Sequence, residues 1–373
     1  MTANRKTTVR THDSYHTSTA LLCLAGVFLL CLLLRNSEVA IEYMRTGLRL
    51  CAATVIPSLF PFMVISELLV DCGFGQLLGK LPGRPMERLF GVSSHAGSAL
   101  LLGFICGFPV GAKTAVSLFD RGLLSKQEVE RVMIFCNIPS SGFLIGAVGV
   151  SMYGDRRFGI FLFFTALLSA LVIGLLTRIL FPIPKESPAD RAHRRLRLPR
   201  IDVTVFTRAI SSATASILSV CACVLFFTSV IGCLSSALRT SETPSSLEAL
   251  LFCLFEISSG VSSAASLGSS AVSATLCGFA IGWSGISVHC QILSLGSDRG
   301  ISFRPYFLAK ISQGLLCAAA SFFYAKSAPL SFPPSSQGFA EISLTDRLSD
   351  TIPLCLVFLI CTMLYCKKQR KRR

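Results

Sequence analysis

The sequence predicts an all-α polytopic membrane protein with about eight transmembrane helices and two glycine-broken re-entrant segments in an inverted repeat. Three observations predict this fold class. The 373 residues are 52% hydrophobic and only 15% charged, whereas a soluble domain carries about 25% charged residues. Long runs that are almost free of charge recur along the chain, as in proteins with several membrane-crossing helices. Two of these runs are interrupted by glycine or proline, a pattern with which secondary transporters build binding sites at membrane depth.

The net charge of +15 lies largely outside the apolar runs. Basic residues cluster at the N-terminus, in the linker that follows residue 182, and in the KKQRKRR tail that begins at Lys367. Cytoplasmic loops of membrane proteins carry such an excess of Lys and Arg, so we expect both termini and the linker to face the cytoplasm. The tail is also suited to contact anionic membrane lipids. We do not expect nucleic acid as a partner.

Motifs for metal binding and catalysis are missing from the sequence. The 16 cysteines lie mostly inside apolar runs, where a free cysteine behaves as a small hydrophobe. The chain has no CxxC pair, no Cys/His cluster with ligand spacing, no phosphate loop, no HExxH motif and no nucleophile elbow. We therefore expect no metal, no cofactor and no enzymatic activity.

The first apolar run, residues 17–34, follows the basic N-terminus and predicts a retained transmembrane helix. A cleaved signal peptide is the alternative, although residues 35–38 offer no convincing cleavage site. Residues 48–70 predict a second span, which contains Pro57, Pro61 and Glu67. Residues 73–88 are rich in glycine and proline and predict a connection.

The next apolar stretch, residues 97–118, is interrupted. Gly103, Gly107 and Gly111 are spaced four apart, Pro109 lies among them, and Lys113 follows at once. The glycine spacing alone fits a helix-packing face. Packing explains neither the proline nor the lysine, whereas a broken helix that lines a binding site accounts for both. The two interpretations stay open at this point.

A helix boundary follows from local signals in the next stretch. Residues 120–122 predict a turn, and Ser125 with Glu128 forms a capping box that begins a helix. This helix is expected to end near Asn137, because Pro139 disfavours helical angles in the residue before it. Ser140 then begins a short apolar helix that ends near residue 153, and residues 158–181 predict a long span.

The second half repeats the pattern loosely after a basic, proline-rich linker. Residues 209–234 predict a span, residues 247–256 a short helix, and residues 258–274 a tract of small residues that permits close helix packing. The segment GFAIGWSGISVHCQ from Gly278 resembles GFICGFPVGAK from Gly103, and residues 300–302 resemble residues 122–125. Residues 306–323 and 353–365 predict the last two spans.

Parity supports an inverted repeat. If the N-terminus, linker and tail are all cytoplasmic, each half crosses an even number of times, so one of its five apolar stretches does not cross. Without the first and last spans, the two halves then have opposite orientations, the arrangement common in secondary transporters. The predicted divisions are 1–16 (N-terminus), 17–36 (first helix), 41–182 (first repeat), 183–204 (linker), 205–325 (second repeat), 326–352 (loop), 353–366 (last helix) and 367–373 (tail).

Candidate binding residues lie at the interruptions, because a polar or charged group inside a membrane is costly and is a functional hypothesis by default. Lys113 is suited to bind an anionic group; its alternatives are an interfacial position or a pair with Glu67. Asn137 and Ser140 lie where a helix N-terminus would present free N–H groups to an anion, with simple capping as the alternative. The full predicted set is Gly107, Pro109, Gly111, Lys113, Asn137, Ser140, Glu256, His289 and Gln291.

Several motifs resemble one family. PSLFPFMVISELL, GFPVGAKTAVSLFDRGLLSKQEVERVMIFCN and FLIGAVGV are similar to segments of the YlbJ-type sporulation integral membrane proteins, which group with the nucleoside-recognition (Gate) domain proteins of endospore-forming bacteria. The second-half counterparts are FEISSG from Phe255 and the GFAIGWSG segment. The resemblance implies a transport role in sporulation, with dipicolinic acid as the implied substrate. It also implies the cell membrane of an endospore former, with the outer forespore membrane as one location.

The resulting interpretation is a transporter of a small anionic solute that works by alternating access around the broken segments. Two alternatives stay open: a scaffold or gating protein of a sporulation complex that does not transport, and a nucleoside or cation permease. The expected partners are the anionic solute and membrane lipids. A second copy of the chain and other sporulation membrane proteins are open partner hypotheses.

Overall fold

The structure is a computed structural model of the chain and describes residues 23–72, 85–183, 204–238, 245–268 and 270–327. Within these ranges the regular structure is helical throughout. Five helices are long and apolar enough to cross a membrane: Ser37–Leu69, Arg156–Leu180, Thr204–Ala237, Ala271–Arg299 and Arg304–Ser327. The chain is thus an all-α integral membrane protein, as the sequence predicts. The number of crossings and the inverted repeat stay predictions.

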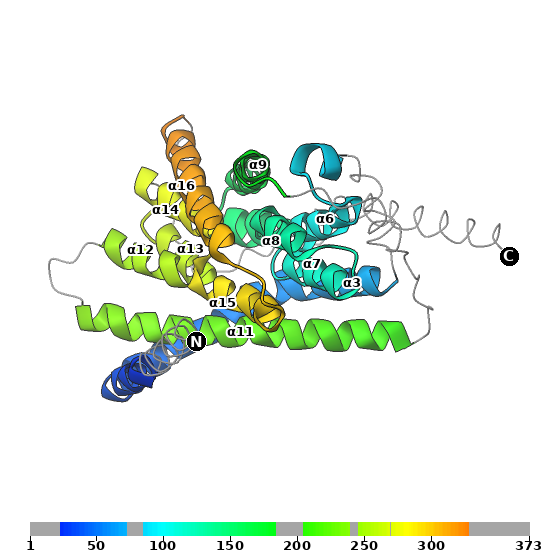
Figure 1. Cartoon of the computed structure of the whole chain (residues 1–373). Helices are drawn as coiled ribbons and strands as arrows, with labels where there is room; N and C mark the ends of the chain where they lie inside the picture. The colour runs from blue at the N-terminus through cyan, green and yellow to red at the C-terminus, as the bar shows by residue number, and fades with distance from the viewer. Residues whose placement is uncertain (1–22, 73–84, 184–203, 239–244, 269, 328–373) are drawn as a thin grey trace, which may run out of the picture. The chain divides into compact units, whose positions relative to one another are not determined.

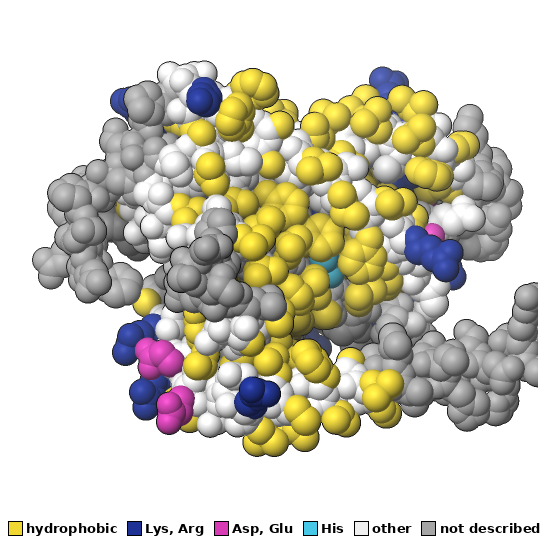
Figure 2. Space-filling model, turned by 90° about the vertical axis from the view of Figure 1, so that its left-hand side faces the viewer, with side chains coloured by type: hydrophobic (Ala, Val, Ile, Leu, Met, Phe, Trp, Pro, Cys, Tyr) yellow, Lys and Arg dark blue, Asp and Glu magenta, His cyan; other side chains and the backbone are white. Residues whose placement is uncertain are grey.

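Apolar side chains cover much of the surface of the described residues. Figure 2 shows a face on which hydrophobic side chains dominate, with Lys, Arg, Asp and Glu gathered toward its margins. Leu168 and Ile179 of the helix Arg156–Leu180 are 58% and 76% exposed, and Leu315 of the helix Arg304–Ser327 is 61% exposed. A soluble protein rarely exposes so large a continuous apolar area, whereas lipid tails solvate it.

The N-terminal described region is one long helical stretch. A helix over Cys23–Arg35 leads into α2 (Ser37–Leu50), the π-helical η1 (Cys51–Val55) and α3 (Ile56–Asp71). The predicted span at residues 48–70 is therefore part of a helix that begins earlier, at Ser37. Pro61 lies inside α3, and Pro57 is the second residue of α3, two residues after the end of η1. Proline cannot donate to the preceding turn, and the wider π-helical turn before it is one accommodation of such a gap.

The remaining first-half elements follow the predicted order. They are η2 (Met86–Phe90), η3 (Ser94–Ala96), α6 (Gly97–Cys106), α7 (Val110–Asp120), α8 (Lys126–Phe135), η4 (Gly142–Met152) and α9 (Arg156–Leu180). The predicted capping box is confirmed, since the Ser125 side chain accepts from the Glu128 N–H and the Glu128 carboxylate accepts from the Ser125 N–H. The predicted end of this helix before Pro139 is confirmed as well.

The second half contains α11 (Thr204–Leu238), α12 (Ser245–Phe255), α13 (Ile257–Ala265), α14 (Ala271–Trp283), α15 (Gly285–Gly296), η5 (Ser297–Arg299) and α16 (Arg304–Ser327). Figure 1 shows α11 along the lower edge of the view, with α6, α7 and α8 above its one end and α12, α13 and α14 above the other. The predicted N-terminal segment 1–16, most of the linker and loop, the last helix at 353–366 and the tail lie outside the described residues.

Two pairs of short helices form hairpins, and two other pairs do not. In the described residues α6 packs against α7, and α12 packs against α13, along their lengths. By contrast, α8 and η4 do not pack side by side, nor do α14 and α15, which together make one interrupted stretch over Ala271–Arg299. The GFAIGWSG segment was predicted to be the second re-entrant segment. In the structure α14 and α15 continue through this break as one stretch, whereas α12 and α13 form the second hairpin. Which segments re-enter the membrane stays a prediction.

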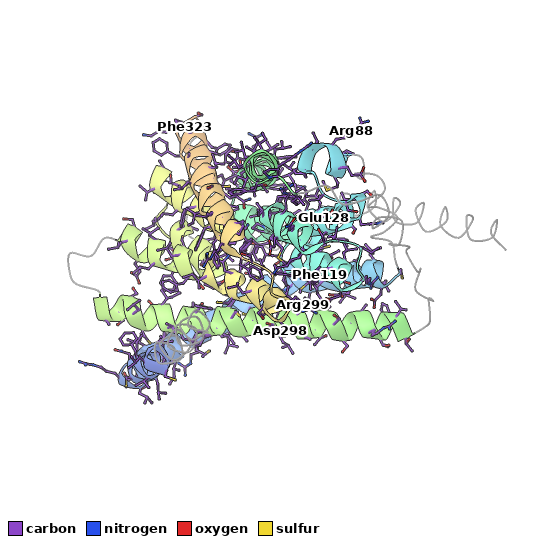
Figure 3. The ribbon with its side chains drawn as sticks, viewed as in Figure 1. Arg88, Phe119, Glu128, Asp298, Arg299 and Phe323 are labelled. Atoms are coloured by element: carbon purple, nitrogen blue, oxygen red, sulfur yellow. The ribbon has the colours of Figure 1, made fainter. Side chains whose placement is uncertain are left out.

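The turns at the ends of α7 and α15 lie together. Gly122 and Gly300 both have left-handed backbone angles, with φ of 67° and 64°. Arg299 donates two hydrogen bonds to the Asp120 carboxylate, at 2.7 and 2.9 Å, and Figure 3 shows Arg299 beside Phe119 of α7. The Ser302 N–H donates to Glu130 at 2.7 Å. Counterparts in an inverted repeat lie on opposite sides of a membrane, so the sequence match between these two turns does not mark the repeat.

By order along the chain, α6–α7 corresponds to α12–α13, and α8–η4 corresponds to α14–α15. Each half then has one hairpin followed by one interrupted helix, and therefore contains two helix interruptions.

Candidate functional site

Four helix interruptions organise the buried centre of the described residues. We call residues 107–109 the first break, residues 136–140 the second break, Glu256 the third break and Ser284 the fourth break. They separate α6 from α7, α8 from η4, α12 from α13 and α14 from α15. A broken helix leaves backbone N–H and C=O groups without intrahelical partners, and in a membrane these groups must be satisfied by protein or by a bound solute.

The first and second breaks provide hydrogen-bond partners for each other's backbone groups. The Phe108 N–H donates to the Ile138 carbonyl at 3.0 Å. The Asn137 side chain accepts from the Ala112 N–H at 3.0 Å and donates to the Met133 carbonyl at 2.9 Å. Asn137 therefore caps the beginning of α7 and the end of α8 at once, rather than the short helix that follows it.

Glycine makes this junction possible, because the two breaks touch through their backbones. A β-carbon on Gly103 or Gly111 would overlap the Cys136 carbonyl oxygen, and one on Gly107 would overlap the Ser140 backbone. The glycine spacing thus serves close packing, and it does so at the break itself. The packing interpretation of residues 97–118 thus holds at the break itself, and a role of this segment in binding stays a prediction.

The third and fourth breaks also meet. The Trp283 indole N–H donates to the Leu254 carbonyl at 2.7 Å. Gly285 has φ of +81°, and a β-carbon there would lie 3.0 Å from the Ile257 nitrogen. The buried Glu256 carboxylate accepts from the N–H groups of Ser258 and Ser259 at 3.1 and 2.6 Å. It therefore occupies the N-terminus of α13, as an N-cap carboxylate does in soluble proteins.

A buried lysine connects the second break to the fourth. Lys310 of α16 is 0% exposed, and its ammonium donates to the Asn137 carbonyl, to Ser284 Oγ and to Gln313 Oε1. Lys310 is not among the residues predicted from the sequence. The signal was present, because Lys310 is a charged residue inside the apolar run 306–323 that was predicted to be a span, and charge in such a run is a functional hypothesis by default.

A small cavity lies where the first, second and third breaks converge. Phe108, Pro139, Ser140, Glu256, Ile257 and Ser258 line it, together with Val288 and Gln291 of α15 and apolar residues of η1, α3, η4 and α11. Its wall is mostly apolar, and its polar lining consists of Ser140, Ser258, Gln291 and the Glu256 carboxylate. The cavity volume is about 20 Å³, room for about one water molecule. The described conformation is therefore closed around this point.

Three of the predicted site residues line the cavity: Ser140, Glu256 and Gln291. Four others form the junction of the first and second breaks and do not line the cavity: Gly107, Pro109, Gly111 and Asn137. The Pro109 carbonyl accepts from the Lys113 N–H at 2.9 Å, as part of the first turn of α7.

Lys113 and His289 lie away from the cavity lining. The Lys113 ammonium is 2.5 Å from Glu67 and 2.7 Å from Ser212 Oγ of α11, so the internal pair with Glu67 is the arrangement that the structure contains. His289 Nδ1 lies 3.0 Å from the Tyr306 hydroxyl, and its ring makes edge contacts with Trp283 and Phe307. His289 is thus part of the packing between α15 and α16.

Two comparisons with known proteins give relatives of this chain. Residues 52–156 match a family model described as Gate, nucleoside recognition; this range contains the first and second breaks. The chain is 29% identical over 339 residues to a protein of Bacillus subtilis (strain 168) described as "Sporulation integral membrane protein YlbJ", and the match covers 81% of each chain. No solved structure matches. The predicted resemblance to these sporulation membrane proteins is confirmed, and neither comparison is to an enzyme family.

Proposed function

From the similarity to a sporulation integral membrane protein, and from the cavity between the first three breaks, we propose that this chain transports a small solute by alternating access. The observation that carries the proposal is the convergence of three helix interruptions, the first, second and third breaks, on one buried cavity. Interrupted helices at membrane depth are costly for a protein that only needs an anchor, and transporters use their free ends to hold solutes and ions.

The closed cavity bears on how such a transporter would work. About 20 Å³ is far below the several hundred Å³ of an ordinary small-molecule site. A solute therefore enters only if an element of the wall moves. The hairpins α6–α7 and α12–α13 contribute Phe108 and Glu256 to the wall, and we propose that movement of one hairpin away from the opposite interrupted helix opens the site.

The proposed solute is dipicolinic acid, following the family resemblance. Its two carboxylates face a lining that contains the Glu256 carboxylate and, among the described residues, neither lysine nor arginine. In a small apolar site, the two carboxylates of the solute and the Glu256 carboxylate would repel each other strongly. We therefore propose that the dicarboxylate enters with a proton or a metal cation, whose charge Glu256 faces.

A nucleoside is the second candidate, because the same lining suits it without a co-ion. A nucleoside carries no charge, and the Ser140, Ser258, Gln291 and Glu256 side chains could hydrogen-bond to its polar edges while the apolar wall contacts its ring. The description of the Gate family as nucleoside recognition names this class of solute. We also propose that the protein lies in the cell membrane of an endospore former, with the outer forespore membrane as one location. Both termini would face the cytoplasm. A second copy of the chain or other sporulation membrane proteins would be its protein partners.

Uptake into vesicles tests the proposal directly. Purified full-length protein would be reconstituted, and uptake of labelled dipicolinate would be compared with that of labelled nucleosides. We expect dipicolinate to accumulate above protein-free vesicles and Glu256→Gln to reduce its uptake at least tenfold. Glu42→Gln is the matched control, because Glu42 is exposed on α2 and makes only a 3.7 Å pair with Arg45.

The outcomes separate the candidates. Nucleoside uptake without dipicolinate uptake would favour the second candidate. No uptake of either solute by protein that is folded and correctly inserted would contradict transport and favour the scaffold alternative. Equal uptake by the wild type and Glu256→Gln would remove the cavity from the mechanism.

A further inference from the structure

Lys310 is a buried cation at the junction of two broken helices, and no carboxylate pairs with it among the described residues. Its side chain is 0% exposed. The ammonium lies 2.5 Å from the Asn137 carbonyl oxygen, 2.9 Å from Gln313 Oε1 and 3.4 Å from Ser284 Oγ. The cavity of the proposed function does not include it.

The hydrogen-bond partners of this lysine favour its charged form. The Asn137 carbonyl can only accept. Gln313 uses its amide N–H groups on the Ala166 carbonyl and Ser169 Oγ, so Oε1 is an acceptor toward Lys310. The Ser284 hydroxyl donates to the Ile281 carbonyl, which leaves its oxygen as an acceptor as well. Three acceptors around one nitrogen suit the charged ammonium, which carries three donors.

The position of this charge has a physical reason. Asn137 follows the C-terminal end of α8, and Ser284 follows the C-terminal end of α14. Helix C-termini carry a partial negative charge and carbonyls without intrahelical partners, so a cation is favourable there. Two such ends that approach each other in a membrane interior form a set of oxygen atoms that would otherwise need a bound cation.

We infer that Lys310 is a tethered cation that occupies a monovalent-cation site between the second and fourth breaks. The site consists of the Asn137 carbonyl, Ser284 Oγ and Gln313 Oε1. Because the ammonium is covalently attached, the junction forms without a dissolved ion. Removal of the side chain should leave these oxygens around an open space and convert the position into a site for Na⁺. This inference concerns folding and holds whether or not the chain transports a solute.

Melting temperature of the purified full-length chain tests the inference, with sodium chloride compared against choline chloride at equal ionic strength. The wild type should melt at the same temperature in both salts. Lys310→Ala should melt at least about 5 °C lower in choline and should regain part of that loss as sodium is raised, with saturation as ligand linkage requires. Lys310→Met fills the space with an apolar chain, so it should be destabilised equally in both salts.

Lys326→Met is the matched control, since Lys326 lies in the last turn of the same helix and is exposed; it should behave as the wild type. Three results would overturn the inference: a wild type stabilised by sodium over choline, a Lys310→Ala variant without a sodium-specific gain, or a Lys310→Met variant as stable as the wild type. If Lys310→Ala does not accumulate in membranes, the wild type and Lys310→Met decide the matter by the same criteria.

Discussion

The contact between α12 and α13 gives a prediction whose size follows from the structure. Gly260 of α13 faces α12 at the closest approach of this hairpin. A β-carbon on Gly260 would lie 2.6 Å from Cys253 Cα, 2.8 Å from the Cys253 nitrogen and 3.1 Å from the Phe252 carbonyl carbon. Non-bonded carbon atoms prefer about 3.5–4.0 Å, so Gly260→Ala requires the two helices to separate by roughly 1 Å.

The surroundings resist such a separation. The three atoms nearest to the new methyl group belong to the backbone of α12, and α12 is held from its other side. Trp283 of α14 donates to the Leu254 carbonyl at 2.7 Å, and Cys253 Sγ approaches the Leu276 carbonyl at 3.6 Å. A shift of α12 therefore disturbs its contacts with α14, and a shift of α13 disturbs the Glu256 cap.

The expected loss is about 2 kcal/mol. Overpacking in a buried site costs about 1–3 kcal/mol, and a further loss from disturbed hydrogen bonds is about 1 kcal/mol. The better helix propensity of alanine offsets up to about 1 kcal/mol. A loss of this size corresponds to a fall of about 4–8 °C in Tm, if about 2–4 °C per kcal/mol applies.

Thermal unfolding of the detergent-solubilised chain, followed by intrinsic fluorescence or a thiol-reactive dye, measures this difference. Gly146→Ala is the control, because Gly146 lies in η4 and a β-carbon there meets nothing within 4 Å; its Tm should equal that of the wild type or exceed it slightly. If Gly260→Ala melts at the same temperature as Gly146→Ala, the backbone contact does not constrain the hairpin and the steric reasoning is refuted.

Two further predictions concern the charge pattern. Lys113→Gln and Glu67→Gln should each destabilise the chain by about 1 kcal/mol or more because each leaves a partly buried charge unpaired, and the double variant should be more stable than the sum of the two losses predicts; strict additivity in Tm measurements would mean that Lys113 is held by something other than Glu67. Reporter fusions placed after the first helix, in the linker at residues 183–204 and at the C-terminus should give the cytoplasmic signal for the linker and the C-terminus; an external signal from the linker would contradict the parity argument for an inverted repeat.

The class of the protein and many of its helix ends could be predicted from the sequence, because local forces determine them. Long apolar runs have no stable place except a membrane or a core. The capping box at Ser125 and Glu128 begins α8 through hydrogen bonds within four residues, and Pro139 disfavours helix in the residue before it. These signals act within one or two turns, so a single sequence is enough to reveal them.

The identity of the second hairpin required the tertiary structure. The GFAIGWSG segment has the glycine pattern of GFICGFPVGAK, yet α14 and α15 continue through their break while α12 and α13 fold back. A glycine in the sequence indicates a close backbone approach or an unusual backbone angle, but it does not indicate which element approaches it. Gly103 meets Cys136, whereas Gly282 of α14 meets Gln313 of α16.

The partners of the charged residues were also decided only by tertiary packing. Lys113 lies against Glu67 and Ser212, which are 46 and 99 residues away along the chain, and Lys310 lies against the Asn137 carbonyl, 173 residues away. A buried ammonium is stabilised by whichever oxygen atoms the fold brings within hydrogen-bond distance. Because those oxygens belong to the ends of separate broken helices, the sequence determines that Lys310 needs partners, and the packing of α16 against the second and fourth breaks determines which partners it has.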